Sequence, residues 1–307
     1  MSISFSVIIS VYNKEKYIKP TIESVINQIY RNFELIVVND GSTDNSLDVI
    51  NSIKDHRIKV ISTLNQGASQ SRNTGMQAAS NPFIALLDGD DLWEHNYLET
   101  IKAAIQDFPE ASVFATAIAH KYENKIVPAI YNFKQDKPVE IKNFFESSLD
   151  HTVLTSSSIV FKKNILEKVG YFDTTLESGE DTDLWIRIGI HYKIVFINKV
   201  LAYYNYVSDS ISNTVFSVKN KPKYNKYFEE EQHDKHLKIY VDRNRFSLAI
   251  LSKLERDKES FSYYKSNINS NNLRLSQNII LNSPRWFIRL LLRLKSLKGE
   301  KLYYPLT

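Results

Sequence analysis

Three carboxylates follow directly on an apolar run at residues 83–91, which read FIALLDGDD. Asp88, Asp90 and Asp91 stand around a single glycine, and like charges this close resist joint ionisation, so the stretch predicts a nearby cation. Carboxylates one residue apart can place oxygens around Mg²⁺ or Mn²⁺, which keeps several waters and takes substrate phosphates as further ligands. A solvated turn is the alternative, because the same spacing occurs by chance in many proteins.

A second acidic cluster lies at residues 178–189, which read SGEDTDLWIRIG. The spacing predicts a helix that begins near Glu180 and Asp181 and turns Leu184, Trp185 and Ile188 toward the core. The unpaired N–H groups of a first helical turn stabilise carboxylates, so an ordinary helix cap would explain this pair without any catalysis.

The first hundred residues alternate between strand and helix patterns. Strands are predicted at residues 5–10, 33–40, 58–62 and 82–88, with an amphipathic helix between each pair. This alternation predicts an α/β fold with a mainly parallel sheet covered by helices on both faces. Ligands of such sheets gather at the carboxyl ends of the strands, where this chain places SVYN, NDGSTD, NQG and DGDD.

Charge divides the chain into two regions. Residues 1–213 carry 20 Lys and Arg against 26 Asp and Glu, whereas residues 214–307 carry 19 against 9, which gives the net charge of +4. We therefore predict a catalytic domain over 1–213 and a basic, mostly helical region over 214–307.

The composition excludes several classes of protein. Without cysteine among its 307 residues, the chain has no disulfides, thiol nucleophiles or Cys-based metal sites. The N-terminus reads as a first strand rather than a signal peptide, and no apolar window reaches about 18 residues, so we predict no transmembrane helix. We expect a cytoplasmic protein, peripheral at most on the inner face of the membrane.

Four motifs together resemble the family 2 glycosyltransferases of the GT-A fold. FSVIISVYN, ELIVVNDGSTDNS, NQGASQSRNTGMQAASNPFIALLDGDDLW and GEDTDLWIRIG occur in the family's order over residues 4–213. The resemblance implies transfer of a sugar from a nucleotide diphosphate donor, usually a UDP-sugar, with inversion at the anomeric carbon and with Mn²⁺ or Mg²⁺.

The resemblance also implies a donor site. Its nucleotide-base pocket would lie in the loop of Tyr12 and Asn13, and Asp40 would accept an N–H of the base. The turn chemistry of NDGS explains Asp40 equally well. Gly67 would turn backbone amides toward the donor, and Arg72 would lie near the base and diphosphate, unless it is an ordinary solvated helix charge.

The metal and acceptor positions follow from the same resemblance. Asp88 would reach the ribose or the metal and Asp90 the metal, with Asp91 as a supporting neighbour. Asp181 would be the general base that deprotonates the acceptor hydroxyl, and Glu180 would hold the acceptor.

The chain departs from the family pattern near residue 207. Relatives often carry Tyr-Arg-x-His before a final Ser-Ile-Ser, and that His can ligate the metal. Asn205 and Val207 stand at the Arg and His positions here. Water or donor oxygens would then have to complete the metal's coordination.

The C-terminal segment 282–301 reads NSPRWFIRLLLRLKSLKGEK. Arg285, Arg289 and Arg293 recur every four residues on a helix rich in leucine, which is typical of a helix lying on an anionic membrane surface. A helix packed on the catalytic domain with its arginines in water is the equal alternative. Membrane binding would suit an acceptor carried on a polyprenyl diphosphate, whereas no nucleic-acid motif is present.

We weigh two other functions against this glycosyltransferase. A sugar-1-phosphate nucleotidyltransferase would want a glycine-rich loop after the first strand, and SVYNKEKYIKP has no glycine. A non-catalytic, membrane-associated carbohydrate-binding or scaffold protein of the same descent would not need both acidic clusters intact.

Overall fold

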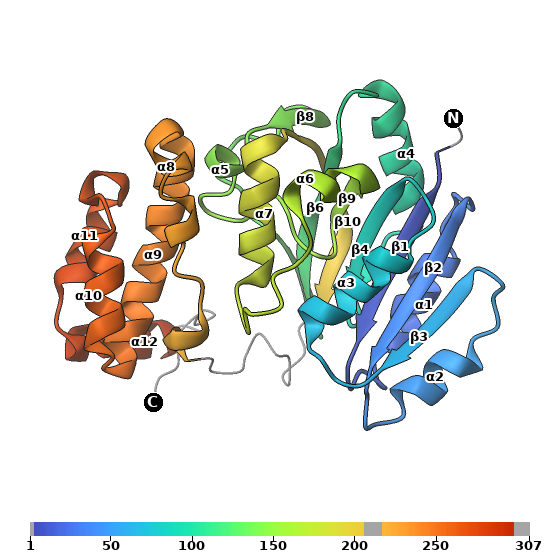
Figure 1. The fold of residues 1–307 in the computed structure, drawn as a ribbon, viewed down its shortest axis with the longest axis horizontal. Coiled ribbons are helices and arrows are strands. Elements are labelled where there is room, and N and C mark those ends of the chain that lie inside the picture. Colours follow the sequence, from blue (N-terminus) through green and yellow to red (C-terminus); the bar gives the residue numbers. More distant parts are fainter. Residues whose placement is uncertain (1–2, 206–216, 298–307) are drawn as a thin grey trace. The chain divides into compact units, whose positions relative to one another are not determined.

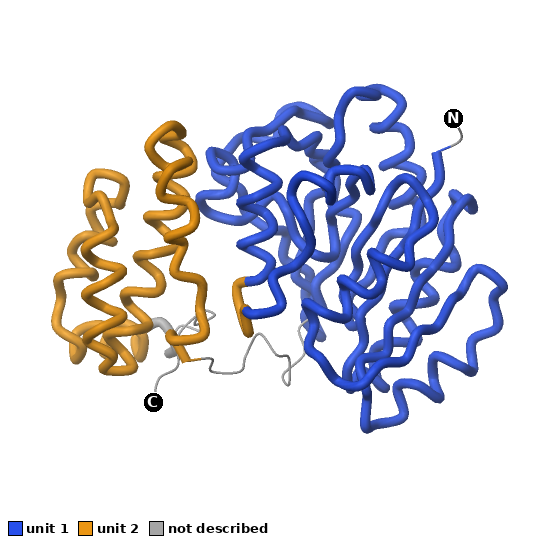
Figure 2. Tube along the Cα trace, in the orientation of Figure 1, with its two compact units in different colours: residues 1–175, 180–210 blue, residues 176–179, 211–307 orange. Residues whose placement is uncertain are grey.

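The computed structural model describes residues 3–205 and 217–297 and divides into two compact units (Figure 2). The first unit contains residues 1–175 and 180–210, and the second contains 176–179 and 211–307. The boundary predicted between 213 and 214 lies outside the described residues. A division of labour between a catalytic and an appended region stays a prediction.

A ten-stranded sheet forms the centre of the first unit (Figure 1). Its strands run in the order β3-β2-β1-β4-β9-β6-β10-β5, with β7 paired to β6 and β8 to β10. They are β1 Phe5–Val11, β2 Phe33–Asp40, β3 Ile58–Thr63, β4 Phe83–Asp88, β5 Leu92–Trp93, β6 Val113–Tyr122, β7 Lys125–Pro128, β8 Val139–Lys142, β9 Ile159–Lys162 and β10 Ile194–Asn205.

The four N-terminal strands are parallel, as the sequence predicts. Their register aligns Ser10 with Asp88 and Asp40 with Thr63, so the polar strand ends lie along one edge of the sheet. β9 joins β4 and β6 in antiparallel pairs and extends the sheet beyond the four parallel strands.

Helices lie along the sheet of the first unit (Figure 1). They are α1 Ile18–Ile26, α2 Ser46–Ser52, α3 Ala68–Ala78, α4 Tyr97–Asp107, α5 Phe144–Ser147, α6 Leu166–Val169 and α7 Glu180–His191, with a short 3-10 helix at Lys163–Ile165. Helix α3 packs very closely on β1, because a Cβ on Gly75 would lie 2.3 Å from Cγ2 of Ile8. This close packing fixes the helix that carries Arg72.

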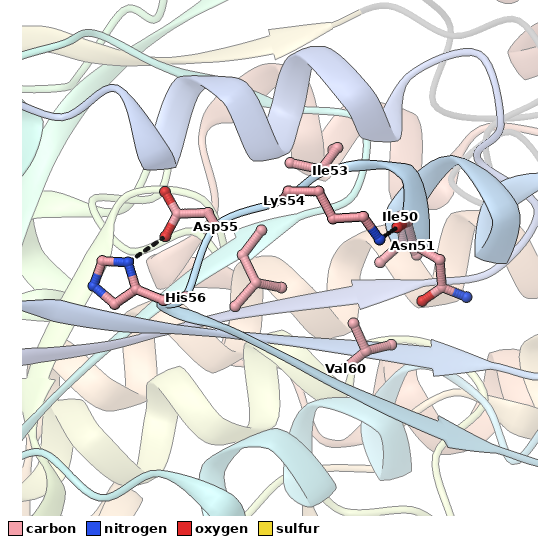
Figure 3. Close-up of a pocket in the computed structure, with 8 residues that line it drawn as sticks. Ile50, Asn51, Ile53, Lys54, Asp55, His56 and Val60 are labelled. Atoms are coloured by element: carbon pink, nitrogen blue, oxygen red, sulfur yellow. Dashed lines mark hydrogen bonds and ion pairs between the residues drawn. The ribbon is translucent and has the colours of Figure 1, made fainter.

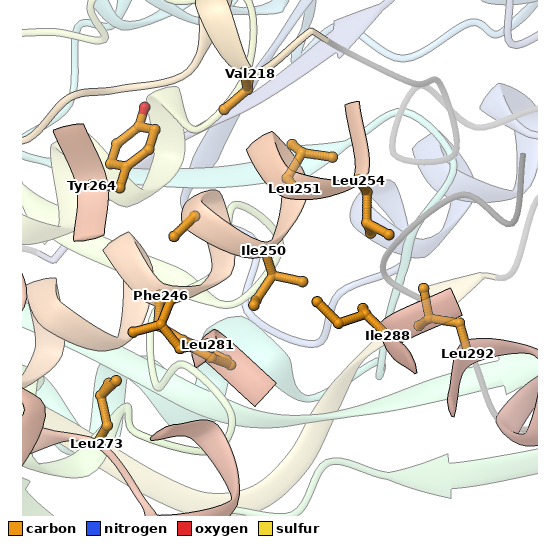
Figure 4. Close-up of a cluster of buried hydrophobic side chains, with 11 residues drawn as sticks. Val218, Phe246, Ile250, Leu251, Leu254, Tyr264, Leu273, Leu281, Ile288 and Leu292 are labelled. Atoms are coloured by element: carbon orange, nitrogen blue, oxygen red, sulfur yellow. The ribbon is translucent and has the colours of Figure 1, made fainter. Parts of the chain in front are cut away.

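The second unit is helical. It contains α8 Glu230–His233, α9 Lys235–Glu255, α10 Lys258–Ser266, α11 Leu275–Asn282 and α12 Arg285–Leu297, with 3-10 helices at Val218–Asn220, Asn225–Tyr227 and Ser270–Asn272. The 21-residue helix α9 contacts α8, α10, α11 and α12. The core shared by α9, α10, α11 and α12 includes Phe246, Ile250 and Ile288 (Figure 4). Within the described residues, no helix is both long enough and apolar enough to span a bilayer.

Candidate active site

The DGDD stretch forms a tight turn at the end of β4. The Asp91 N–H donates to the Asp88 carbonyl at 3.1 Å, which closes the turn. A Cβ on Gly89 would lie 2.9 Å from the Ser10 carbonyl oxygen, so the turn can press against the end of β1 only with glycine at this position. The carboxylates of this turn are thereby held at the carboxyl ends of the parallel strands.

Asp91 supports the turn from inside. It is 1% exposed, and its carboxylate accepts hydrogen bonds from the Ser157 hydroxyl at 2.5 Å and the Asn205 N–H at 3.1 Å. Burial, together with the charges of Asp88 and Asp90, raises the pKa of Asp91 well above its ordinary value. The supporting function expected for Asp91 agrees with this geometry.

Asn205 holds the same turn a second time. Its side-chain amide donates to the Asp90 carbonyl at 2.6 Å. The residue that replaces the family's usual arginine therefore braces the acidic turn, which the sequence did not predict. Position 207, where the family's histidine is absent, lies outside the described residues.

The cation that the acidic turn demands is partly supplied by Lys14. The Lys14 ammonium lies 2.5 Å from the Asp90 carboxylate, and the two side chains are 15% and 14% exposed. Burial raises the pKa of Asp90, while Lys14 opposes that rise. Lys14 is not among the predicted site residues. The only signal in the sequence is its position directly after Tyr12 and Asn13.

Arg72 brings the two acidic clusters together. Its guanidinium lies 2.8 Å from Asp88, 3.3 Å from Glu180 and 3.4 Å from Asp181. Burial alone would lower the pKa of Arg72, but the three carboxylates more than compensate and raise it. Two acidic motifs about a hundred residues apart thus share the positive charge of Arg72. The alternative of a solvated helix charge is wrong for Arg72.

An aromatic platform fixes the Arg72 side chain. The guanidinium carbon lies 5.3 Å from the centroid of the Phe172 ring, a cation–π distance. The Asn73 side chain in turn donates to the Phe172 carbonyl at 2.9 Å and accepts from the Phe172 N–H at 3.0 Å. Neighbouring residues of α3 therefore position both the arginine and its platform.

The carboxylate of Asp181 has an unusual pKa. Burial raises the pKa of Asp181 to about 7, against the opposing charge of Arg72 and with help from Glu180. The Ser156 hydroxyl donates to it at 3.3 Å. Its side chain still keeps 37% of its surface exposed, and its function as the general base stays a prediction.

Asp183 supports the same helix end. It is fully buried and accepts a hydrogen bond from Nε of Arg187 at 3.0 Å, and Arg187 donates onward to the carbonyls of Val169 and Tyr171. This network anchors the first turn of α7 to the segment before Phe172, as expected for a loop-supporting carboxylate.

Asp40 ends β2, and its carboxylate fixes the segment between β3 and α3. It is 3% exposed and accepts from the Thr63 hydroxyl at 3.2 Å, the Gln66 N–H at 3.0 Å and the Gly67 N–H at 2.8 Å. A carboxylate has about four lone-pair sites, so a contact to a nucleotide base would use the remaining one. The base contact of Asp40 stays a prediction.

Gly67 begins α3 with φ of +89°, a conformation that side chains rarely adopt. A Cβ there would meet no atom within 4 Å, so the backbone angle and not space requires glycine. The residue is exposed, which leaves the start of α3 open to a ligand, and its donor contact stays a prediction.

Tyr12 and Asn13 lie on the exposed loop after β1. Tyr12 is 37% exposed. Asn13 has φ of +52°, and its side-chain oxygen accepts from the Thr43 N–H at 2.8 Å, which ties its loop to the loop after β2. Asn13 therefore shapes the predicted base pocket, while contact of either residue with a base stays a prediction.

Asp88 and Asp90 have the donor chemistry for a hard divalent ion. Their carboxylate oxygens are the ligands that Mn²⁺ and Mg²⁺ prefer. Four carboxylates (Asp88, Asp90, Glu180 and Asp181) share the charges of Lys14 and Arg72, so a further cation improves the charge balance. In the chain as described, no three acidic or histidine side chains form a ready metal site. Water and diphosphate oxygens would thus supply the other ligands.

A separate hollow lies beside α2 and β3 (Figure 3). Its lining residues, which include Lys54, Asp55 and His56, stand at the amino end of β3. The predicted site residues follow the carboxyl ends of the strands instead. This hollow contains none of them.

A family model described as Glycosyl transferase family 2 matches residues 6–170, more than half of the chain. The chain belongs to glycosyl transferase family 2. This match covers the three donor-side motifs, from the loop after β1 to the DGDD turn and beyond, and confirms the family that the sequence resembles.

Curated relatives extend the likeness of this family 2 chain to the GEDTDLWIRIG motif. The Escherichia coli protein named UDP-Glc:alpha-D-GlcNAc-diphosphoundecaprenol beta-1,3-glucosyltransferase WfaP is 31% identical over 220 residues, which cover 69% of this chain and 80% of WfaP. A Rickettsia bellii protein named an uncharacterized glycosyltransferase is 32% identical over 219 residues, or 70% of this chain. This match spans only 30% of the Rickettsia protein.

A solved structure shows the fold of this family 2 chain. The crystal structure of S. aureus TarS 1-349 in complex with UDP-GlcNAc matches with a TM-score of 0.74 at 20% identity, over 97% of this chain and 93% of that one. At this identity the likeness shows the fold, and the predicted GT-A fold is confirmed.

Proposed function

We propose that the protein is an inverting, metal-dependent glycosyltransferase that uses a UDP-sugar. The observation that carries the proposal is the Arg72 guanidinium, which lies within 3.4 Å of Asp88, Glu180 and Asp181. One buried cation thus joins the carboxylate predicted for the donor to the pair predicted for the acceptor. A non-catalytic scaffold would not need these two clusters to converge on one charge.

In the proposed reaction, Asp181 accepts the proton of the acceptor hydroxyl. The acceptor oxygen forms a bond to the anomeric carbon as the bond from that carbon to the diphosphate breaks, and UDP leaves with the electron pair. Attack opposite to the leaving group inverts the anomeric centre. Glu180, the chain neighbour of Asp181, would hold the acceptor.

Asp88 and Asp90 would hold Mn²⁺ or Mg²⁺. A bound divalent ion supplies stabilisation of the negative charge on the leaving diphosphate. Arg72, which lies 2.8 Å from Asp88, would take up part of that charge, because planar guanidinium groups match phosphate oxygens well.

We further propose an acceptor that is a glycan or a sugar on a polyprenyl diphosphate. WfaP, by its name, transfers glucose to a GlcNAc on diphosphoundecaprenol. Helix α12 offers a surface that suits such a lipid: Ile288 and Leu292 face the core, whereas Trp286, Leu290 and Leu294 are 66%, 46% and 49% exposed. Together with the exposed Arg293, this face could contact the anionic inner surface of a membrane.

Calorimetric titration with UDP tests the metal assignment. UDP should bind more tightly with Mn²⁺ than without it, and Asp90→Ala should remove that difference. Asp107→Ala, an exposed carboxylate at the end of α4, is the control and should bind like the parent protein. Metal-dependent binding that survives in Asp90→Ala would contradict the assignment.

A further inference from the structure

Hydrogen bonds of its backbone hold Lys14 in place independently of its ammonium group. Its N–H donates to the Ser46 hydroxyl at 2.7 Å, and its carbonyl accepts from the N–H groups of Tyr17 at 2.8 Å and Ile18 at 2.9 Å. Both polar groups of the Lys14 backbone are therefore occupied. Only the side chain can change partners without disturbing the loop.

The Lys14 side chain lies along the glycine of the acidic turn. Its Cγ is 3.6 Å from the position where a Cβ on Gly89 would stand. From there the ammonium reaches Asp90 at 2.5 Å, in a pair that is largely shielded from water. In the free protein, an internal cation thus sits on one of the two carboxylates proposed to hold the metal.

A divalent ion on Asp90 and the Lys14 ammonium would repel each other. Like charges that share one carboxylate repel strongly where water screens them poorly, as at this largely buried pair. Lysine has a long flexible stem, so the ammonium can move to another anion rather than stay beside the metal. The anion that arrives with the metal in the proposed reaction is the donor diphosphate.

We propose that Lys14 is a further donor-binding residue that exchanges partners: it neutralises Asp90 in the free protein and binds the diphosphate when metal and nucleotide are bound. The inference rests on the proposed function, because it needs both the metal and the diphosphate. Lys14 opposes the binding of metal alone and favours nucleotide in the presence of metal. Its removal should therefore have opposite effects on the two affinities.

The test measures Mn²⁺ and UDP binding separately in the full chain. Free Mn²⁺ is followed by electron paramagnetic resonance in the absence of nucleotide, and UDP is then titrated by calorimetry at saturating Mn²⁺. In Lys14→Met we expect Mn²⁺ alone to bind about tenfold more tightly and UDP about tenfold more weakly, as for loss of one charge-assisted contact. Lys16→Met removes an exposed charge two residues away and should change each affinity less than about twofold.

Unchanged or weaker Mn²⁺ binding in Lys14→Met would overturn the exchange, and so would unchanged UDP binding. If Lys14 only braces the turn, Lys14→Met would lower the thermal midpoint of unfolding and leave the UDP affinity unchanged. Should Lys14→Met not fold, Lys14→Gln is measured in its place with the same expected signs. Absence of metal-dependent UDP binding in the parent protein would contradict the proposed function itself, which is a different result from a failure confined to the lysine variants.

Discussion

Each unit of the protein contains a buried arginine among carboxylates, and the two are built differently. In the second unit, Arg245 is fully buried and binds Glu231 at 2.5 Å and 2.7 Å with both terminal nitrogens. Lys238 lies 3.2 Å from Glu231 and 2.5 Å from Asp242, so two cations face two carboxylates. The charges of this cluster are balanced, and we call it closed because Arg245, Glu231 and Asp242 are at most 4% exposed.

The cluster of Arg72 in the first unit is neither balanced nor closed. One guanidinium faces three carboxylates, which keep 24%, 17% and 37% of their side-chain surfaces exposed. Two of the three contacts exceed 3.2 Å, longer than ordinary charge-assisted hydrogen bonds. From this difference we predict that the cluster of Arg245 stabilises the fold, whereas the cluster of Arg72 binds a ligand.

The largest effect on stability should come from the closed cluster. Arg245→Met leaves Glu231 and Asp242 buried with Lys238 alone, and we expect a loss of about 3–5 kcal/mol in the free energy of unfolding. Urea unfolding followed by circular dichroism measures it. Lys235→Met, an exposed lysine on the same helix, should cost less than about 0.5 kcal/mol.

A substitution in the cluster of Arg72 should affect ligand binding more than stability. Arg72→Met should weaken UDP binding at saturating Mn²⁺ by about 10- to 100-fold, because a charge-assisted contact to the diphosphate is lost. Its carboxylates remain within reach of water, so the loss of stability should stay below that of Arg245→Met. A variant as unstable as Arg245→Met with unaltered UDP affinity would make Arg72 a structural residue like Arg245.

The pH dependence of transfer sharpens the comparison further. With a pKa of about 7, Asp181 loses its function as a base as the pH falls, and kcat/KM for the donor should be about tenfold lower at pH 6 than on its plateau. The raised pKa also affects the free energy of unfolding. Asp181 stabilises the folded state at pH values below its ordinary pKa of 3.8, and this contribution is lost as the pH rises through about 7. A flat profile between pH 6 and pH 8 would move the base elsewhere.

The smallest effect concerns the second unit's surface. Trp286→Ser should weaken binding of the full chain to vesicles with anionic lipid by about fivefold, since one exposed aromatic side chain is withheld from the interface. Leu64→Ser, which alters an 83% exposed side chain of the first unit, is the control and should bind as the parent does. If the parent protein does not co-sediment with vesicles at any content of anionic lipid, the membrane proposal is wrong.

Sequence reasoning predicted the sheet well because its signals are local. The run at residues 33–40 became β2 with the same bounds, and Asp88 ends β4 as expected. The acidic motifs could also be found from the sequence, because each is a short continuous stretch. What the sequence could not give is which charges meet, because Arg72 contacts carboxylates 16 and 108 residues away.

Two residues of the site escaped prediction for the same reason. Lys14 meets Asp90 across 76 positions of sequence, and Asn205 meets the same turn across 115. Neither residue type is unusual in its own segment. Only the register of β1 and β10 in the folded sheet brings them to the acidic turn.

The central claim is that the carboxylates at Arg72 form the catalytic centre, with Asp181 as the base. It is tested most directly by Asp181→Asn, which keeps shape and hydrogen-bonding groups but cannot accept the proton. UDP release from a UDP-sugar in the presence of a polyprenyl-diphosphate-linked sugar should fall by about 10²- to 10⁴-fold. UDP affinity at saturating Mn²⁺ should stay within about threefold, because the donor contacts remain. Transfer near the parent rate in Asp181→Asn would contradict the account.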